Sequence, residues 1–516
     1  SRVLWMPDVF GFSWSLPQLA REAGMKYMFT TKMGWNEYNY LPFESFWWQG
    51  LDGSCLLTHF SPIRFNNEGF PGTYNAHVSP EEVAGSWKHT FQKEGGRVGQ
   101  NVPQLMCFGY GDGGGGPTRQ MLKNIRLFEN FPGVPRVKPG TAAGYFEALE
   151  SDFGSDLPFW NGELYLEYHR GTYTSQARIK QDNRRSECAL HNAEFLGSAA
   201  AALDPDFRYP VEELRKAWHI VCLNQFHDIL PGSSIHEVYV EAAEDYREAR
   251  GLAESALDGA MEALAGRMGG ELLLANPTGF TVRQPVWVRQ DLIPDIQPLL
   301  ENGCAAMQSV QDGVLLDLEP LPPYSVAALD KVDSSTAELE SDLSVSETHM
   351  ENSLLRLEFT PSGDLVRIYD KELDREVLAE GRVGNELQLF EDRPAVPEAW
   401  DISIYYDDRM WLPDPAESVE VQETGPLRAA VRIQRRFRRS TITQEIRLWS
   451  ACRRIDFATE VDWQERRMML KAAFPVEILS PKAEYEIQWG SIERPTHRNT
   501  SWDFARFEVP AQKWVD

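Results

Sequence analysis

The pattern of apolar residues changes twice along the 516-residue chain, and these changes limit the fold more than any other feature. Residues 1–150 alternate short apolar runs with helical stretches and glycine-rich loops, which is typical of alternating strands and helices. Residues 151–268 have mostly helical patterns, and such amphipathic helices pack together as a bundle. Residues 269–516 carry short β-type runs between turn residues, which indicates antiparallel sheets in a sandwich. We therefore expect a multidomain α/β, α and β chain with a partial β/α barrel, a helical bundle and a β-sandwich.

The charge and the cysteines exclude several classes of protein. The net charge of −26 comes from 51 basic and 77 acidic residues, and such a chain repels nucleic acids and anionic membrane surfaces. No apolar stretch reaches about 18–20 residues, so the sequence predicts no transmembrane helix. The six cysteines are scattered and form no Cys-x-x-Cys motif, which argues against a thiolate zinc site and favours reduced thiols in the cytoplasm.

A carboxylate follows the first apolar run directly. Val3–Pro7 is expected to form a buried strand, Leu16–Gly24 a helix and Lys26–Thr31 the next strand, so Asp8 lies at the C-terminal end of the first strand. This end of the strand is where β/α barrels place catalytic groups. Position alone leaves a second interpretation equally open, in which Asp8 only caps the helix that follows.

A second acid lies in a glycine-rich loop. Leu105–Tyr110 is predicted as a strand and Arg119–Glu129 as a helix, with Asp112 among the glycines between them. Gly109, Gly111 and Gly114 fit the dinucleotide pattern, but the charge of Asp112 would oppose a pyrophosphate. We interpret the loop as one that lets a bulky polar ligand approach the backbone closely while the acid faces it. A plain flexible loop is the alternative.

Two polar segments follow in the helical region. Asn224–Ser234 contains the adjacent pair His227 and Asp228 where Pro231 and Gly232 are expected to end a helix, so the pair could supply a metal ligand and a substrate acceptor. A capping histidine beside a solvated aspartate is the plainer interpretation. His169–Gln176 is dense in hydrogen-bonding groups and could line a polar pocket or form interdomain salt bridges.

Taken together, these segments resemble glycoside hydrolase family 38, the retaining α-mannosidases, and most closely its cytosolic and vacuolar branch. The matching segments span nearly the whole chain in family order. They are Trp5–Gly11, Lys32 with Trp35 and Asn36, Phe46–Ser54, Gly111–Thr118, His169–Gln176, Asn183–Arg185, Asn224–Ser234, Arg494–His497 and Asn499–Asp503.

The resemblance implies a role for each matched residue. Asp8 corresponds to the nucleophile, which also binds zinc in this family, and His227 corresponds to a second zinc ligand. Asp112 lies in the loop that supplies the acid/base. The resemblance places four residues at the bound sugar: Lys32, Trp35, Tyr173 and Asp228. The implied cofactor is Zn²⁺ or another divalent metal such as Co²⁺, and the implied partner is a mannoside or an oligosaccharide.

The chain departs from the family in one respect. Family members carry a His-x-Asp pair near the start of the catalytic domain, and no such pair precedes Asp8 here. Asp8 and His227 leave two protein ligands, whereas a catalytic zinc usually has three. We therefore expect an internal fragment, with 1–150 as the C-terminal part of the catalytic barrel and 269–516 as a truncated sandwich. Such a fragment should bind zinc weakly and have little activity alone.

The expected function is retaining, metal-dependent hydrolysis of terminal α-linked mannose from oligosaccharides or small α-mannosides. Hydrolysis of mannosylglycerate on the same scaffold is a close alternative. A non-catalytic carbohydrate-binding protein and a structural subunit that assembles through its β domain are alternatives from other classes. A homo-oligomer is compatible with the sequence.

Overall fold

The computed structural model describes residues 1–62, 72–93, 102–111, 114–269, 272–292, 307–329, 341–395 and 399–516. The chain forms two compact units, and neither is continuous in sequence. Unit 1 comprises residues 1–175, 396–401 and 480–516, and unit 2 comprises residues 176–395 and 402–479. No described helix is both long and apolar enough to span a bilayer.

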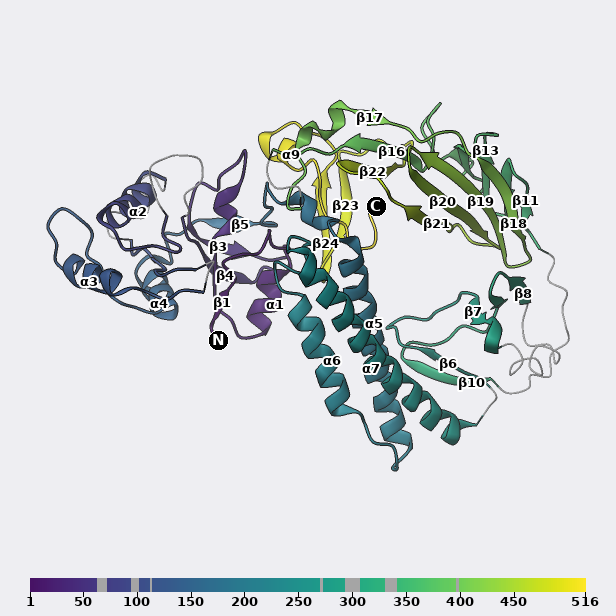
Figure 1. Ribbon diagram of the computed structural model, residues 1–516, viewed down its shortest axis with the longest axis horizontal. Coiled ribbons are helices and arrows are strands. Elements are labelled where there is room, and N and C mark those ends of the chain that lie inside the picture. The colour runs from purple at the N-terminus through teal and green to yellow at the C-terminus, as the bar shows by residue number, and fades with distance from the viewer. Residues whose placement is uncertain are drawn as a thin grey trace. The chain divides into compact units, whose positions relative to one another are not determined.

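A five-stranded sheet forms the centre of unit 1 (Figure 1). Its strand order is β1-β2-β4-β3-β5, and all neighbours are parallel except β3 and β4, which are antiparallel. The strands are β1 (Val3–Trp5), β2 (Tyr27–Thr30), β3 (Ser45–Gln49), β4 (Cys55–Phe60) and β5 (Phe159–Asn161). The parallel pairing of β1, β2 and β4 brings their carboxyl ends to one edge of the sheet.

The alternation of side chains along these strands gives the sheet an apolar layer on each face. Phe46, Trp48 and Leu56 belong to one buried cluster, which Trp502 from the C-terminal segment joins. Tyr27, Phe29 and Leu57 belong to the other, together with Phe146 and Leu149. The remaining elements of unit 1 are α1 (Leu16–Glu22), η1 (Lys32–Trp35), α2 (Pro80–Lys93), α3 (Arg119–Phe128), α4 (Ala142–Phe153), η2 (Arg170–Tyr173), β23 (Lys482–Ile487), β24 (Gly490–Pro495) and α9 (Ser501–Ala505).

The predicted strand, helix and strand at the start of the chain are confirmed as β1, α1 and β2, although Trp5 is exposed and β1 is not fully buried. The helix predicted from Arg119 is also confirmed, as α3. The strand predicted over Leu105–Tyr110 is wrong, because that segment forms only an isolated bridge between Phe108 and Ala76. The neighbouring residues 73–75 bend and do not form a strand.

Three long helices of unit 2 lie side by side (Figure 1). They are α5 (Ala177–Leu203), α6 (Val211–Asn224) and α7 (His236–Met268). Alanines fill much of their common core, which allows the helix backbones to approach closely. The helix α6 ends at Asn224, well before the predicted stop at Pro231, because residues 226–232 form successive turns.

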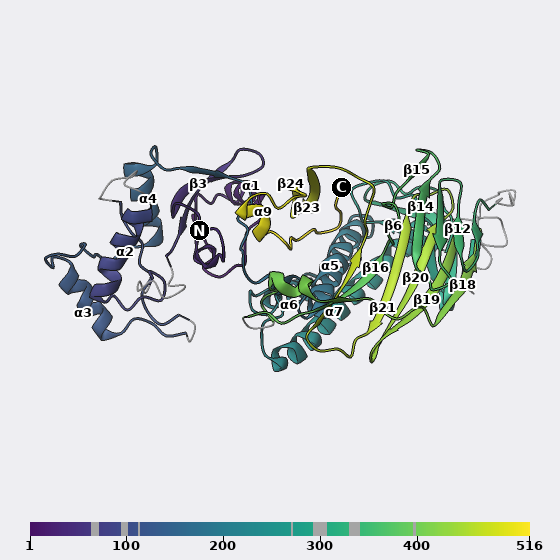
Figure 2. The same cartoon turned by 90° about the horizontal axis from the view of Figure 1, so that it is seen from above.

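The sheets of unit 2 are antiparallel, as predicted. The five-stranded sheet β11-β12-β13-β14-β15 and the four-stranded sheet β18-β19-β20-β21 enclose one apolar core (Figure 2). Their strands are β11 (Ser344–Val345), β12 (His349–Glu351), β13 (Leu355–Phe359), β14 (Leu365–Asp370), β15 (Arg375–Glu376), β18 (Ser418–Thr424), β19 (Arg428–Phe437), β20 (Ser440–Trp449) and β21 (Ile455–Asp462).

Smaller sheets complete the described part of unit 2. The strand β6 pairs with β10, β9 lies between β7 and β8, and β16 lies between β17 and β22. Their bounds are β6 (Leu272–Asn276), β7 (Val286–Arg289), β8 (Met307–Val310), β9 (Gly313–Leu316), β10 (Ser325–Leu329), β16 (Glu386–Glu391), β17 (Met410–Trp411) and β22 (Met468–Ala473), with the short helices η3 (Gln290–Leu292) and η4 (Ile404–Asp408). The chain is thus a multidomain protein of mixed sheets and helices.

Candidate active site

Asp8 lies in the turn that follows β1, at the carboxyl end of the parallel strands. The backbone holds this turn in place, because Pro7 accepts hydrogen bonds from the amide and the hydroxyl of Thr31 beside the end of β2. The cap of α1 is Ser15, so the interpretation of Asp8 as the helix cap is wrong. Asp8 thus sits where a sheet of this kind presents functional groups.

Lys32 forms an ion pair with Asp8. Its Nζ lies 2.9 Å from Asp8 Oδ1, and the exposed side-chain fractions are 11% for Lys32 and 36% for Asp8. Lys32 opens the short helix η1 directly after β2, so neighbouring parallel strands deliver the acid and the base to one point. The carboxylate is thus held by a charge-assisted contact and keeps access to solvent.

Aromatic rings surround the Lys32 ammonium. It lies 4.2 Å from the ring centre of Trp35 and 5.6 Å from that of Phe10. Both rings also approach His169, at centroid distances of 6.2 Å and 4.7 Å. The structure therefore brings together three predicted site residues, Asp8, Lys32 and Trp35, in an apolar and aromatic corner that we call the Asp8 corner.

His169 is a buried neutral member of this corner. Burial, together with the Lys32 charge, lowers the pKa of His169 to about 3. Its backbone is left-handed, with φ 61°, and its buried Nδ1 has no hydrogen-bond partner among the described residues. Trp400, from the second sequence segment of unit 1, contributes a further ring at a centroid distance of 6.3 Å.

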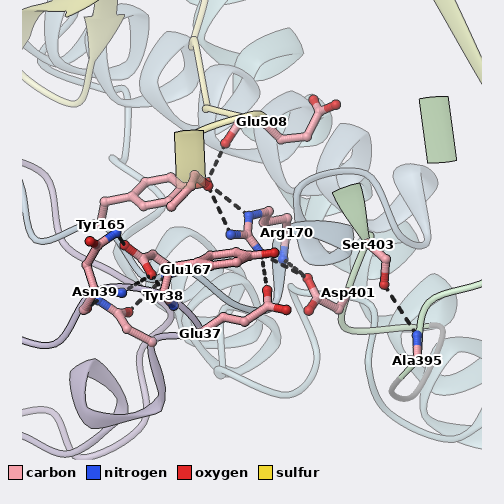
Figure 3. A network of polar contacts seen from close by, with 12 residues as sticks. Glu37, Tyr38, Asn39, Tyr165, Glu167, Arg170, Ala395, Asp401, Ser403 and Glu508 are labelled. Carbon is pink, nitrogen blue, oxygen red and sulfur yellow. Dashed lines mark hydrogen bonds and ion pairs between the residues drawn. The ribbon is translucent and has the colours of Figure 1, made fainter. Parts of the chain in front are cut away.

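The next residue, Arg170, fixes this segment in place (Figure 3). Its backbone N–H donates to Asp401 Oδ1 at 3.0 Å, and its guanidinium donates to the Tyr165 hydroxyl at 3.2 Å and to the Ala505 carbonyl at 3.0 Å. Arg170 Nη1 also lies 3.8 Å from Asp401 and 3.9 Å from Glu37. Arg170 is fully buried, so these contacts hold a charge that is costly to leave unpaired.

Glu167 attaches the same segment to the loop after η1. Its carboxylate accepts from the backbone amides of Tyr38 and Asn39, each at 2.8 Å, and from the Asn39 side chain at 2.7 Å (Figure 3). Burial raises the pKa of Glu37 in this loop and raises that of Tyr165 to about 12. The loop that follows Trp35 and the segment that carries His169 are therefore tied together by polar contacts.

Two further predicted site residues are not part of the Asp8 corner as described. Tyr173 ends η2, where its electrostatic neighbours are Tyr165, Glu163, Arg170 and Arg494, and burial raises its pKa. Asp112 falls outside the described residues, so its predicted place beside a ligand stays a prediction. Thr118 caps the helix α3 that follows this loop, and its side chain accepts a hydrogen bond from the Met121 amide.

His227 and Asp228 lie in unit 2, in the turns between α6 and α7. His227 Nε2 is 3.5 Å from Asp228 Oδ2, and the two side chains are 32% and 47% exposed. The Asp228 carbonyl accepts from the hydroxyls of Ser233 and Ser234, which closes the turn on itself. The cap of α6 is Gln225, so His227 does not cap that helix.

The residues that the structure describes do not make a zinc site on their own. Within the described ranges, no three His, Cys, Asp or Glu side chains are arranged to hold one metal ion. Asp8 and His227 are both suitable zinc ligands by chemistry, but they belong to different units and number only two. One oxygen of Asp8 faces the Lys32 ammonium instead.

Sequence reasoning missed Trp400 and Asp401. They contact His169 and Arg170 from a sequence position more than two hundred residues away, so no local pattern marks them. The density of polar residues at His169–Gln176 did signal that this segment makes many contacts. Its hydrogen bonds to residues 399–401 and 505 all lie within unit 1.

Comparison with family models covers most of the chain. The glycosyl hydrolases family 38 N-terminal domain matches residues 1–163, the alpha mannosidase middle domain matches residues 167–264, and the glycosyl hydrolases family 38 C-terminal domain matches residues 350–516. The three models occur in the order expected for one family.

Individual relatives give the same result. The chain is 37% identical to Alpha-mannosidase 2C1 of Homo sapiens over 99% of its own length and 47% of that protein. It is 32% identical to Alpha-mannosidase G of Dictyostelium discoideum, covering 99% of this chain and 49% of that one. The chain thus spans about half the length of the curated relatives it matches.

The fold has a counterpart among solved structures. The crystal structure of an alpha-mannosidase from Enterococcus faecalis V583 superposes with a TM-score of 0.76 at 16% identity, covering 98% of this chain and 66% of that chain. With the three domain models in family order, and with the Asp8 corner at the end of β1, the chain belongs to glycosyl hydrolase family 38.

Proposed function

We propose that the protein is an α-mannosidase that removes terminal α-linked mannose from oligosaccharides or small α-mannosides with retention of configuration. The observation that carries this proposal is the position of Asp8. Within a family 38 chain, it is a partly exposed carboxylate at the end of β1, fixed by Lys32 in an aromatic corner. The names of the relatives, which are α-mannosidases, support the substrate class.

Asp8 is proposed as the nucleophile. Retaining hydrolysis needs two carboxyl groups roughly 5–5.5 Å apart, of which one attacks the anomeric carbon while the other protonates the leaving oxygen and later activates water. Lys32 orients Asp8 through its 2.9 Å contact with Oδ1. Asp112 is proposed as the acid/base on the strength of its match to the family loop.

The sugar would lie against the aromatic side of the Asp8 corner. Pyranose rings present apolar C–H faces that pack on flat rings, and Trp35 and Phe10 provide such rings next to the carboxylate. Asp228 and Tyr173 are proposed as further sugar contacts from the family match. The neutral state of His169 avoids a second cation beside Lys32.

The metal is proposed as zinc, or another divalent ion such as cobalt, with Asp8 and His227 as two of its ligands. Zinc would supply a Lewis acid that binds sugar hydroxyl groups. A working site needs at least one more ligand than these two residues. We therefore expect this chain alone to bind zinc weakly.

We propose the domain boundaries 1–150 for the part of a β/α barrel, 151–268 for a helical bundle and 269–516 for a β-sandwich. The helical bundle is supported by the packing of α5, α6 and α7. The β-sandwich is supported by the two facing sheets of unit 2. A cytoplasmic location is proposed because Cys55, Cys107, Cys188, Cys222 and Cys452 are free thiols, the state that reducing compartments maintain.

The deciding experiment is hydrolysis of an aryl α-mannoside by the protein that contains this chain. Asp8→Asn should lower kcat/KM on the order of 10⁶-fold, the scale for loss of a covalent nucleophile. Asp52→Asn is the matched control, because Asp52 is an exposed turn carboxylate bonded to Ser54 in the same unit. NMR of the first-formed sugar anomer tests retention, and a chelator tests the metal. Full activity of Asp8→Asn would refute the assignment.

A further inference from the structure

A hollow of about 450 Å³ lies on the helical part of unit 2, and none of its lining residues has been given a role in the proposed hydrolysis. Two helices form it, α5 from its first turn onward and α7 near its middle. The residues that line it are Ala177, Arg178, Gln181, Asp182, Arg185 and Arg250. Five of them come from α5 at spacings of three, four and seven residues, which places them on one face of the helix.

The charges around this hollow do not balance within the described structure. Asp182 is buried, and its carboxylate lies 2.5 Å from Arg250 Nη1 and 3.7 Å from Arg178 Nε. Arg185 makes no ion pair with any described residue. Three guanidinium groups around one carboxylate leave two positive charges at the hollow, in a chain whose net charge is −26.

We propose that this hollow binds the phosphate group of a small molecule, either inorganic phosphate or a phosphate monoester. Each guanidinium carries five N–H donors in a planar fork, which matches the oxygens of phosphate and can bind them in pairs. A phosphate carries about −1.5 to −2 charges at pH 7, which the excess of two positive charges complements. A carboxylate would compensate only half of that excess.

The start of α5 adds to the same preference. Ala177 and Arg178, which line the hollow, are the first two residues of this 27-residue helix. The preceding residue, Gln176, has a left-handed backbone and makes no side-chain cap. The first amides of the helix are therefore not capped by that side chain, and they carry the partial positive charge of a helix N-terminus.

The size of the cluster selects a small ligand. Three arginines from two neighbouring helices are enough to bind a single phosphate group. A nucleic acid needs a longer row of basic residues, and this acidic chain would repel it. This site is independent of the proposed hydrolytic activity, because none of its residues belongs to the Asp8 corner or to the His227 turn.

Calorimetric titration of the protein with inorganic phosphate tests the proposal. The ionic strength is held constant with chloride, and a chelator is present so that a metal-bound phosphate does not contribute. Arg185→Ala and Arg178→Ala should each weaken binding at least tenfold. Arg184→Ala is the matched control, because Arg184 is the neighbour of Arg185 on α5 and is paired with Glu187 outside the hollow.

Three results would overturn the proposal. One is phosphate binding by Arg185→Ala and Arg178→Ala that equals that of the parent protein. Another is an equal loss in Arg184→Ala, which would indicate general charge attraction. The last is competition by acetate as strong as that of phosphate, which would contradict the preference for a dianion. Binding of a sugar phosphate at least as tight as inorganic phosphate would identify a monoester as the ligand.

Discussion

Two polar segments of this chain are similar in sequence but differ in how far the structure buries their side chains. In the segment 167–173, His169 is 6% exposed and Arg170 is 0% exposed. In the segment 225–234, the side chains of His227 and Asp228 are 32% and 47% exposed. Each segment pairs a histidine with a charged neighbour, so composition alone does not separate them.

The difference lies in what the polar groups bind. The groups of the first segment bond to residues far away in the chain, such as Asp401 and Ala505. The second segment is closed locally, because the hydroxyls of Ser233 and Ser234 donate to the Asp228 carbonyl a few residues earlier. A polar run in a sequence can therefore be a buried structural joint or a partly exposed surface for ligands, and burial decides which.

The largest expected effect is the loss of the buried charge in the first segment. Arg170→Met should destabilise unit 1 by about 3–5 kcal/mol, because it leaves buried polar partners without their cation. Hydrogen exchange of peptides that cover β2 and β4 measures the loss of stability in unit 1, without the assumption that both units unfold together. Arg215→Met, at an exposed arginine of α6, is the control and should change stability by no more than about 0.5 kcal/mol. A similar small value for Arg170→Met would remove the contrast between the segments.

The second effect is a pH dependence that arises from His169. Its pKa is lowered to about 3 in the folded protein, whereas an unfolded histidine titrates near 6.5. Between these pKa values the unfolded state binds more protons than the folded state. The contribution of neutral His169 to the free energy of unfolding is therefore complete above about pH 6.5, and it decreases by about 1.4 kcal/mol for each pH unit below that. Asparagine tolerates the left-handed backbone at this position. In His169→Asn, the free energy of unfolding should therefore fall by about 2 kcal/mol less between pH 6 and pH 4.5 than in the parent protein.

The control for that measurement is His191→Asn, at an exposed position of α5, which should leave the pH dependence unchanged. Denaturant unfolding at several pH values, followed by a probe in unit 1, gives the slopes. Parallel curves for the parent and for His169→Asn would show that His169 is not held neutral by its surroundings.

A smaller effect is expected from a methyl group at Gly171. A Cβ there would lie 3.0 Å from the backbone of Trp400 and Asp401, which cannot give way as a flexible side chain would. Gly171→Ala should therefore cost about 1–3 kcal/mol of stability in unit 1. Gly251→Ala, in an open position of α7, is the comparison and should be neutral or slightly stabilising. Thermal unfolding of both variants ranks them, and equal melting temperatures would place residues 400–401 farther from the first segment.

The smallest stability effect is expected in the second segment. His227→Ala should change the free energy of unfolding by less than about 0.5 kcal/mol, because the side chain is partly exposed and the turn is closed by other groups. If His227 is a zinc ligand, the same variant should weaken zinc binding at least tenfold in equilibrium dialysis. A loss of stability comparable to that of Arg170→Met would instead make this turn a structural joint.

Local patterns predicted the local elements well. The spacing of apolar residues located β1, α1, β2 and α3 close to their observed bounds, and the change of pattern at residue 269 marked the start of the antiparallel sheets. Asp8 could be singled out because it follows the first predicted strand, whereas Lys32 was marked only by the resemblance to the family. The strand predicted over Leu105–Tyr110 was wrong, because an apolar run forms a strand only where a neighbouring strand pairs with it, and here only one isolated bridge forms.

The contacts that shape the candidate site could not be predicted in this way. Trp400 and Asp401 reach His169 and Arg170 only through the fold, and Trp502 joins the core of the first sheet from the other end of the chain. Burial of His169, and therefore its neutral state, also depends on these distant residues. Each of these facts comes from tertiary packing, which a single sequence does not display.

The return of residues 480–516 to unit 1 has a consequence for how the chain is made. The bond from Arg170 to the Ala505 carbonyl spans 335 residues, and the bond from Ser15 to the Gln488 carbonyl spans 473. At a synthesis rate of about 5–20 residues per second, the first sheet must wait tens of seconds on the ribosome for these partners. During that interval nearly all of unit 2 emerges and can fold first. Slow codons or chaperone binding during this interval should thus affect the yield of unit 1 more than that of unit 2.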